Sequence, residues 1–189
     1  RKTVLEYDDV MNTQRKVIYD QRRQVLDGEN LQKTIEGMMR FVVQLQLDDS
    51  FGHADYLEDR AQLDAVLAHF EGLYMPKGAV QVSGDELATM TRAQLEEQIL
   101  TAMHKTYAAK EAEYGEKTMR ELERVILLRV VDEYWMDNID AMADLRQGIP
   151  LRSYGQHNPV DVYKKEGYEM FEGMTNAIRE ETVRRLFSV

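Results

Sequence analysis

The residues whose types are suited to binding chemistry gather in one stretch, LRQGIPLRSYGQHNP, at positions 145–159. Two arginines, a tyrosine, two glycines and two prolines lie there beside the apolar Ile149 and Leu151. Tyrosine and arginine are favoured where a surface grips a partner, so the composition predicts binding rather than catalysis. The alternative is that Leu151 or Tyr154 folds back onto its own molecule.

Catalytic and nucleotide sites find little support in the remaining residues. Asp8 and Asp9 are adjacent, and neighbours on a helix point about 100° apart, so they do not share a proton and are expected to be solvated or paired with a cation. The GEKT run at Gly115 lacks the glycine-rich loop that cradles a phosphate. No nucleophile, base and orienting group come together, so we expect no enzyme in this chain.

Metal sites also lack a pattern in the sequence. The histidines are scattered, and none of them has the i, i+4 spacing of a helical zinc site. They are His53, His69, His104 and His157. Cysteine is absent, which removes thiolate ligands and disulfides and fits a reducing compartment. We therefore expect no metal site.

The stretch at 145–159 must be positioned by two long helices. Nothing breaks a helix from about Glu116 to Gln147, and a second helix is predicted from Pro159 to about Phe187. The first carries an apolar stripe of Met119, Leu122, Ile126, Val130, Tyr134 and Leu145. Two long helices with so short a connection should lie antiparallel. Gly148 is expected to end the first helix, Pro150 to prevent its continuation and Pro159 to start the second, with a tip at about 148–159.

The rest of the chain also reads as helical. Residues 1–28 form one amphipathic helix that stops at Gly28. Residues 29–115 are predicted to contain several helices, including one at 56–70 and one that starts at Thr91 with a capping box to Gln94 and ends at Gly115. LDDSFGHAD (47–55) is predicted as a break, and MPKGAVQVSGD (75–85) as a loop.

Composition favours an all-α fold and excludes some partners. Proline occurs only three times in 189 residues, and helix-forming residues dominate. A net charge of −10 argues against nucleic acid as a partner, because phosphate binding needs a concentrated basic face. No apolar run is long enough to span a membrane. The chain starts without methionine inside a patterned segment, so we expect it to be part of a longer protein.

Two long segments resemble the SecA family of preprotein-translocating ATPases. RKTVLEYDDVMNTQRKVIYDQR resembles the start of the family's helical scaffold, and YWMDNIDAMADLRQGIPLRSYGQHNPVDVYKKEGYEMF resembles its two-helix finger. The segment between them lies where the family has a helical wing domain. The resemblance therefore implies an all-α chain with a long scaffold helix (1–28), a small wing domain (29–115) and a scaffold continuation with an antiparallel two-helix finger (116–189).

The resemblance also implies roles for three sets of residues. The finger tip, which in this family is thought to contact the translocating chain at the SecY channel, corresponds to Ile149, Leu151, Arg152 and Tyr154. An element that regulates ATP hydrolysis corresponds to Trp135, Leu145, Arg146, Gln147 and Gly148, although packing alone also explains Trp135. The scaffold residues that would join the finger to the motor are Asp8, Asp9, Asn12, Gln14 and Arg15.

Partners and cofactors follow from the same resemblance. We expect contacts with motor domains of the same polypeptide, the SecY channel, unfolded preprotein and, through the whole protein, an anionic membrane surface; a homodimer is also compatible. ATP and Mg²⁺ are expected only in motor domains that this chain lacks. The protein is expected in the cytoplasm, peripherally bound to the inner face of the bacterial plasma membrane. The rival reading is a passive helical scaffold whose hairpin only braces neighbouring domains.

Overall fold

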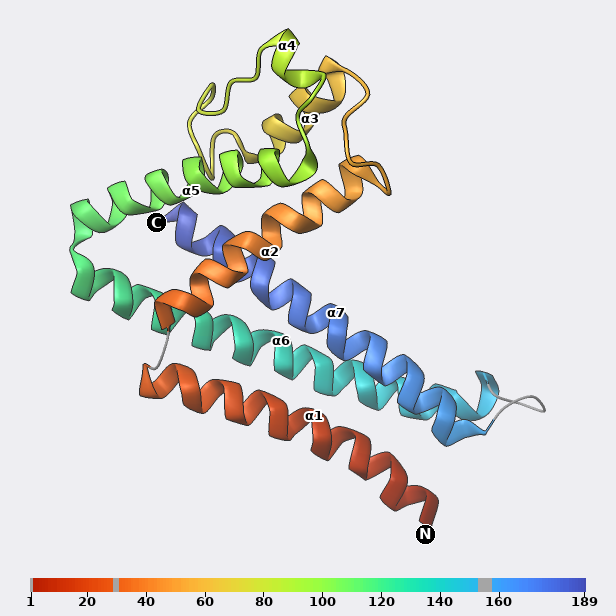
Figure 1. The fold of residues 1–189 in the computed structure, drawn as a ribbon. Coiled ribbons are helices and arrows are strands. Elements are labelled where there is room, and N and C mark those ends of the chain that lie inside the picture. The colour runs from red at the N-terminus through yellow and green to blue at the C-terminus, as the bar shows by residue number, and fades with distance from the viewer. Residues whose placement is uncertain (1, 29–30, 153–157) are drawn as a thin grey trace. The chain divides into compact units, whose positions relative to one another are not determined.

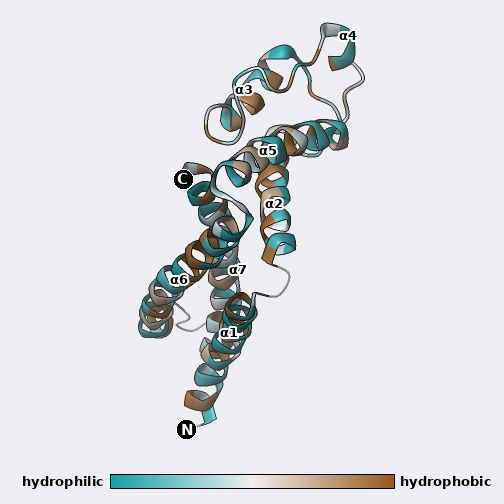
Figure 2. Ribbon diagram, turned by 90° about the vertical axis from the view of Figure 1, so that its left-hand side faces the viewer, coloured by the Kyte–Doolittle hydropathy of each residue, from teal (hydrophilic) through white to brown (hydrophobic). Residues whose placement is uncertain are grey.

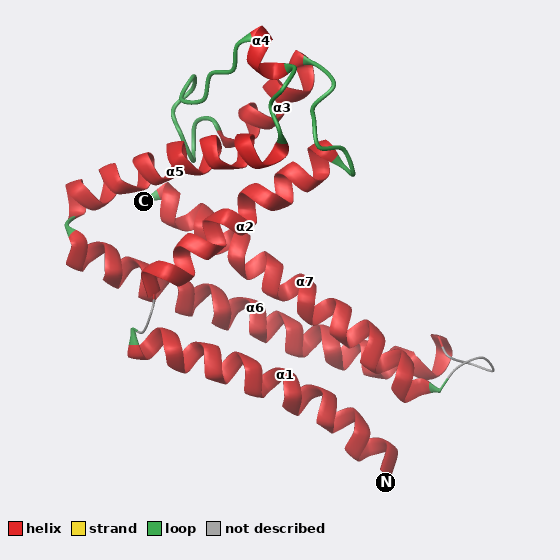
Figure 3. Ribbon diagram, in the orientation of Figure 1, coloured by secondary structure: helices red, strands yellow, loops and turns green. Residues whose placement is uncertain are grey.

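The structure is a computed structural model that describes residues 2–28, 31–152 and 158–189. The described residues form helices and no strand, so the all-α prediction is confirmed (Figure 3). The helices are α1 (Lys2–Asp27), α2 (Leu31–Phe51), α3 (Arg60–Phe70), α4 (Gly84–Leu87), α5 (Arg92–Tyr114), α6 (Glu116–Arg152) and α7 (Pro159–Ser188). None of the helices in the described part of the chain is long and apolar enough to cross a membrane.

The chain divides into two compact units. Unit 1 comprises Arg1–Glu29 and Arg124–Ile178, and unit 2 comprises Asn30–Glu123 and Arg179–Val189. Helices α6 and α7 each contribute residues to both units. The domain limits expected from the sequence, after residues 28 and 115, stay a prediction.

Unit 1 consists of three long helical segments that pack along their lengths. Helix α1 and the unit 1 part of α6 run in opposite directions, since Asp8 pairs with Arg146 and Arg22 pairs with Asp132. The part of α7 in this unit runs antiparallel to α6 (Figure 1). The expected antiparallel hairpin is therefore present in the described residues. Figure 2 shows that apolar and polar residues alternate around these helices, as packing along one face requires.

Helix α6 continues beyond the end expected from its sequence. It passes through Gly148 and Pro150 to Arg152, and Gly148 does not have a positive φ. The expectations that Gly148 ends the helix and that Pro150 prevents its continuation are therefore wrong. Met142, Leu145 and Ile149 lie on one helical face and are all buried, so packing favours helical geometry through Ile149. Pro150 removes only one backbone donor, which is tolerable so close to a helix end.

Unit 2 is a helical assembly built around the pairing of α2 with α5, and α2 also contacts α3. Its aromatic core includes Tyr74, whose ring centroid lies 5.2 Å from that of Phe187, and Tyr107, 5.4 Å from the same ring. The predicted capping box of Thr91 and Gln94 is confirmed at the start of α5.

Glycines and a carboxylate set several helix limits in the two units. Gly28 and Gly115 have φ of 72° and 91° and follow α1 and α5, as predicted. Two other limits were predicted wrongly. Helix α2 continues to Phe51, and α3 starts at Arg60 rather than at residue 56, because Asp59 accepts a hydrogen bond from the Gln62 amide as its N-cap.

Candidate functional site

The end of the α6–α7 hairpin in unit 1 is built on a buried apolar cluster. Its fully packed members are Met142, Leu145, Ile149 and Tyr163. Partly buried apolar side chains from α1 and α7 pack against them, namely Tyr7, Val10, Met11, Val162 and Met170. The cluster joins α1 to both helices of the hairpin, so it holds the base of the tip in place.

Arg146 lies beside this cluster and interacts with two side chains of α1. Its Nη1 is 3.1 Å from Asp8 Oδ1, and its guanidinium carbon is 4.9 Å from the ring centroid of Tyr7. The Tyr7 ring in turn meets Tyr163 edge to face, with the centroids 5.0 Å apart. Burial raises the pKa of Tyr163 above its ordinary value, although the positive charge of Arg146 acts in the opposite direction.

A buried amide network lies along the same three helices. Asn138 Nδ2 donates to Gln14 Oε1 at 2.9 Å, and Gln14 Nε2 donates to the carbonyl oxygen of Gly167 at 3.1 Å. Gln14 and Asn138 are only 6% and 5% exposed. The Sδ atom of Met142 lies 3.9 Å from Gln14 Nε2. Gln14, expected as a link to the motor, thus makes its side-chain hydrogen bonds within unit 1.

The predicted tip residues have different environments. Leu151 is 87% exposed at the end of α6, as expected of a contact residue. Ile149, expected from the resemblance to be part of the contacting tip, is 0% exposed, so its side chain is buried in the described structure. The physical reason is its place one helical turn beyond Leu145 on the buried face of α6. Tyr154 lies outside the described residues, and Arg152 is the last residue of α6.

The other predicted site residues lie on α1 and α6 of unit 1. Trp135 is 7% exposed and Leu145 is buried, whereas Gln147 is exposed. On α1, Asn12 Oδ1 accepts a hydrogen bond from Arg15 at 2.9 Å, and the carbonyl of Asp9 accepts one from Thr13 at 2.9 Å. Of the scaffold set, Asp8 and Gln14 are the residues for which the described structure shows side-chain contacts to the hairpin.

Unit 2 contains a polar cluster that the sequence analysis missed. Glu123 is 1% exposed, and its carboxylate accepts a short hydrogen bond from the hydroxyl of Tyr107. Arg120 Nε lies 2.8 Å from Glu123 Oε1, and Arg120 also pairs with Glu111. Burial raises the pKa of Glu123, against the effect of the Tyr107 hydrogen bond and the charge of Arg120. The cluster joins the end of α5 to the start of α6.

A signal for this cluster was present in the spacing of α6. The buried positions are Met119, Glu123, Leu127, Val130, Val131, Trp135, Asn138, Met142, Leu145 and Ile149. They recur at steps of mostly three and four residues, with one glutamate and one asparagine among apolar side chains. A glutamate that falls on an apolar stripe is a candidate for a buried polar contact.

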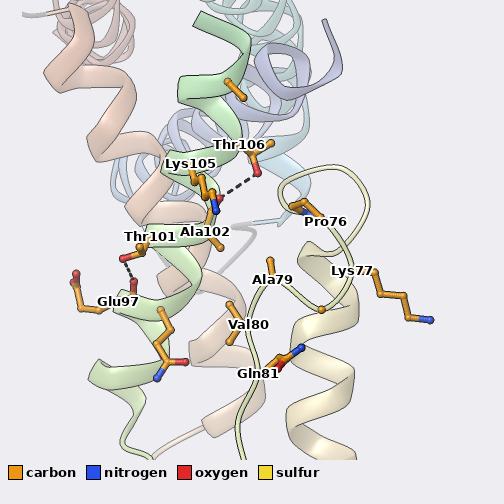
Figure 4. Close-up of a pocket in the computed structure, with 13 residues that line it drawn as sticks. Pro76, Lys77, Ala79, Val80, Gln81, Glu97, Thr101, Ala102, Lys105 and Thr106 are labelled. Carbon is orange, nitrogen blue, oxygen red and sulfur yellow. Dashed lines mark hydrogen bonds between the residues drawn. The ribbon is translucent and has the colours of Figure 1, made fainter. Parts of the chain in front are cut away.

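Unit 2 has a groove of about 1010 Å³ between residues 76–81 and one face of α5 (Figure 4). The hydroxyls of Thr101 and Thr106 donate to the carbonyls of Glu97 and Ala102, so their protons are used within the helix. Lys77 and Lys105 also line the groove. No group of three or more metal-ligating side chains is found there or elsewhere in the described residues.

Comparisons with known proteins agree with one another. A family model described as the SecA Wing and Scaffold domain matches residues 1–189. The protein translocase subunit SecA of Clostridium acetobutylicum is 46% identical over 189 residues, which are 100% of this chain and 22% of that protein. The same subunit of Pelotomaculum thermopropionicum is 47% identical, over 100% of this chain and 21% of that protein. Protein translocase subunit SecA 1 of Clostridioides difficile is 42% identical, over 100% and 20%.

The matches cover all of this chain but only part of each relative. The whole chain is matched, yet it spans about a fifth of the length of the curated relatives it matches. Full coverage of this sequence by the family model, supported by relatives above 40% identity, identifies its place: the chain belongs to the SecA family, within the wing and scaffold region.

Proposed function

We propose that this chain is the wing and scaffold segment of an ATP-driven protein translocase, and that the end of its α6–α7 hairpin contacts preprotein at the SecY channel. The observation that carries the proposal is the match over residues 1–189 to a family whose relatives are named protein translocase subunits. ATP and Mg²⁺ are assigned to other segments of the full-length protein. We place that protein in the cytoplasm, peripherally bound to the inner face of the plasma membrane.

The geometry of the hairpin end supports a contact role. Leu151 exposes 87% of its surface directly after the buried cluster of Leu145, Ile149 and Tyr163. An exposed apolar side chain on a braced support is suited to contact many different sequences, because apolar contact needs no matching hydrogen-bond pattern. Arg152 and Tyr154 are proposed to act beside it.

A regulatory role is proposed for the part of α6 that precedes the tip. Arg146 interacts with Asp8 and Tyr7 of α1. A movement of the hairpin end would therefore pull on α1 through these contacts. Trp135, Leu145, Gln147 and Gly148 belong to the same helix. We propose that this segment couples the tip to the motor: when the tip binds preprotein, the segment passes the change on through α1.

A second function is favoured by a specific observation. Ile149 is buried and its neighbours pack against Tyr7 and Val10, so the hairpin end binds its own molecule. In this alternative the hairpin is a passive brace, and Leu151 is an incidental exposed residue.

Site-specific crosslinking distinguishes these functions. Tyr154→Cys and Leu151→Cys would be placed separately in a cysteine-free full-length translocase, with Asp137→Cys on the exposed side of α6 as the control. A preprotein is stalled in the channel, and adducts with channel and preprotein are measured. Adducts from the tip positions and none from Asp137→Cys support the contact role. Intact transport without adducts from any position favours the brace.

A further inference from the structure

The buried amide network of Gln14, Asn138 and the Gly167 carbonyl joins three helices of unit 1 through polar groups, whose burial carries a desolvation cost. Gln14 and Asn138 are almost fully buried, and the other buried positions of α1 and α6 in unit 1 are apolar. A buried amide costs free energy unless its hydrogen bonds are made, and well-packed apolar residues often stabilise a core equally well. Directional hydrogen bonds add something that apolar packing lacks, because they are satisfied in a single alignment of the helices.

Gly167 allows α7 to take part in the amide network that joins α1 and α6. A Cβ at this position would lie 2.8 Å from Met142 Cε and 3.6 Å from Val10 Cγ1. Without that Cβ, the backbone of α7 lies close enough for Gln14 Nε2 to reach the Gly167 carbonyl at 3.1 Å. One glutamine of α1 therefore bonds to both helices of the hairpin.

Two ion pairs between α1 and α6 lie on either side of the network and fit the same lengthwise alignment of these helices. Asp8 and Arg22 are fourteen positions apart on α1, and Asp132 and Arg146 are fourteen positions apart on α6. The pairs are 3.1 Å and 3.0 Å long, and their side chains are partly exposed. Exposed pairs contribute little to stability, so the buried amides are the stronger determinant of alignment.

We propose that Gln14 and Asn138, together with the carbonyl of Gly167, are positioning residues that fix the lengthwise register of the hairpin on α1. The hairpin end then moves with α1 as one body and does not slide along it. This inference rests on the proposed function, because it concerns how motion reaches a tip that contacts preprotein.

The test uses a substitution that keeps the packing and removes the directional bonds. Gln14→Leu with Asn138→Leu is made in the cysteine-free full-length protein, with spin labels at Lys16 on α1 and Asp144 on α6, both exposed. The unmodified network should give one narrow distance. The apolar variant should keep its melting temperature but show a second distance, displaced by about one helical turn, ~5 Å. Transport per ATP hydrolysed should fall by roughly threefold or more, because interaction energies within coupled networks correspond to factors of at least this size.

Two further variants make the result decisive. Gln24→Leu places the same substitution at an exposed position of α1 and should change neither distance nor transport. Gln14→Asn with Asn138→Gln exchanges the amides and should restore a single distance and most of the transport. It also decides the question if the apolar variant does not fold: an exchange variant with a single native distance and no transport would overturn the proposal.

The failure of this inference can be separated from failure of the proposed function. An apolar variant with one native distance and full transport shows that the amides only pack, and it overturns the register proposal. A tip variant without effect on transport overturns the proposed function, whereas the distance measurement still reports on register.

Discussion

Asp8 and Arg146 form an ion pair of 3.1 Å between α1 and α6, and both side chains are more than a third exposed. Solvent screens such a pair, so Asp8→Asn should lower the free energy of unfolding by less than about 1 kcal/mol. The loss should shrink at high salt, because screening already weakens the native pair. Urea unfolding at low and high salt measures both effects, with the neighbouring Asp9→Asn as control. A loss that is large and independent of salt would contradict this account.

Gly167 and Gly173 on α7 form a matched pair for substitution by alanine. A Cβ at Gly167 would lie 2.8 Å from Met142 Cε, whereas nothing lies within 4 Å of one at Gly173. Gly173→Ala should stabilise the protein by about 0.4–1 kcal/mol, because alanine restricts the unfolded chain and favours the helix. Gly167→Ala should destabilise it by roughly 1–3 kcal/mol, because Met142 or α7 must move.

Thermal and urea unfolding of the two alanine variants check this prediction. Met142 is fully buried, so Met142→Ala destabilises the protein by itself, but it removes the atom that a Cβ at Gly167 would meet. In a double-mutant cycle, Gly167→Ala should therefore cost less in the Met142→Ala background than in the native one. Equal stability of the two glycine variants would show that Met142 moves aside at no cost.

The helix ends were largely predictable because local chemistry sets them. Gly28, Gly115 and Pro159 stand where helices end or begin, and Thr91 forms its capping box with a residue three positions away. Each of these signals depends only on neighbours in sequence. The start of α3 was harder to predict from sequence. Asp59 is its N-cap, but it lies in a polar stretch where other residues could equally cap a helix.

The apolar stripe predicted for α6 coincides with its buried face only in part, at Met119, Val130 and Leu145. The pattern of apolar residues alone favoured Leu122, Ile126 and Tyr134, which are only partly buried. The face is instead completed by Glu123 and Asn138, whose burial depends on partners on α5 and α1. Pattern analysis counts polar residues against a buried face, so it could not include positions that tertiary hydrogen bonds satisfy. The burial of Ile149 was missed for a related reason, since its cluster is formed by α1 and α7.

Glu181 should make the stability of unit 2 sensitive to acid. Hydrogen bonds from Arg184 and Arg185 lower the pKa of its carboxyl group to about 2. A carboxyl group with a lowered folded-state pKa contributes stability above its ordinary pKa and loses it as pH falls through the folded value. Glu181→Gln should therefore destabilise the protein at neutral pH and lose less stability than the native chain between about pH 5 and pH 2. Thermal unfolding across this range tests it, with the adjacent exposed Glu180→Gln as control.

Glu123 should have the opposite pH dependence. Burial raises its pKa, so its contribution is fully present below the ordinary pKa of glutamate and is lost as pH rises through the folded value. Glu123→Gln keeps an acceptor for Tyr107 and should flatten the decline in stability above that range. Glu123→Ala leaves the Tyr107 hydroxyl and Arg120 without this partner and should cost about 2–4 kcal/mol. Urea unfolding from acid to neutral pH separates the two variants; an equal loss in both would show that the hydrogen bond is unimportant.

Leu151 and Ile149 provide a direct test of contact against packing at the hairpin end. Leu151 is 87% exposed, so Leu151→Ala should leave the melting temperature unchanged and reduce preprotein transport if the tip contacts its partner through this side chain. Ile149 is fully buried, so Ile149→Ala should cost about 2–5 kcal/mol of stability by opening a cavity beside Tyr163. Unfolding measurements and a transport assay on both variants in the full-length protein check the pair. Normal transport by a stable Leu151→Ala, with transport lost only when Ile149→Ala loosens the cluster, would favour the brace over the contact role. The two substitutions remove side chains of the same size from positions two residues apart, on roughly opposite sides of α6. A difference between them therefore reports on where each side chain points rather than on what was removed.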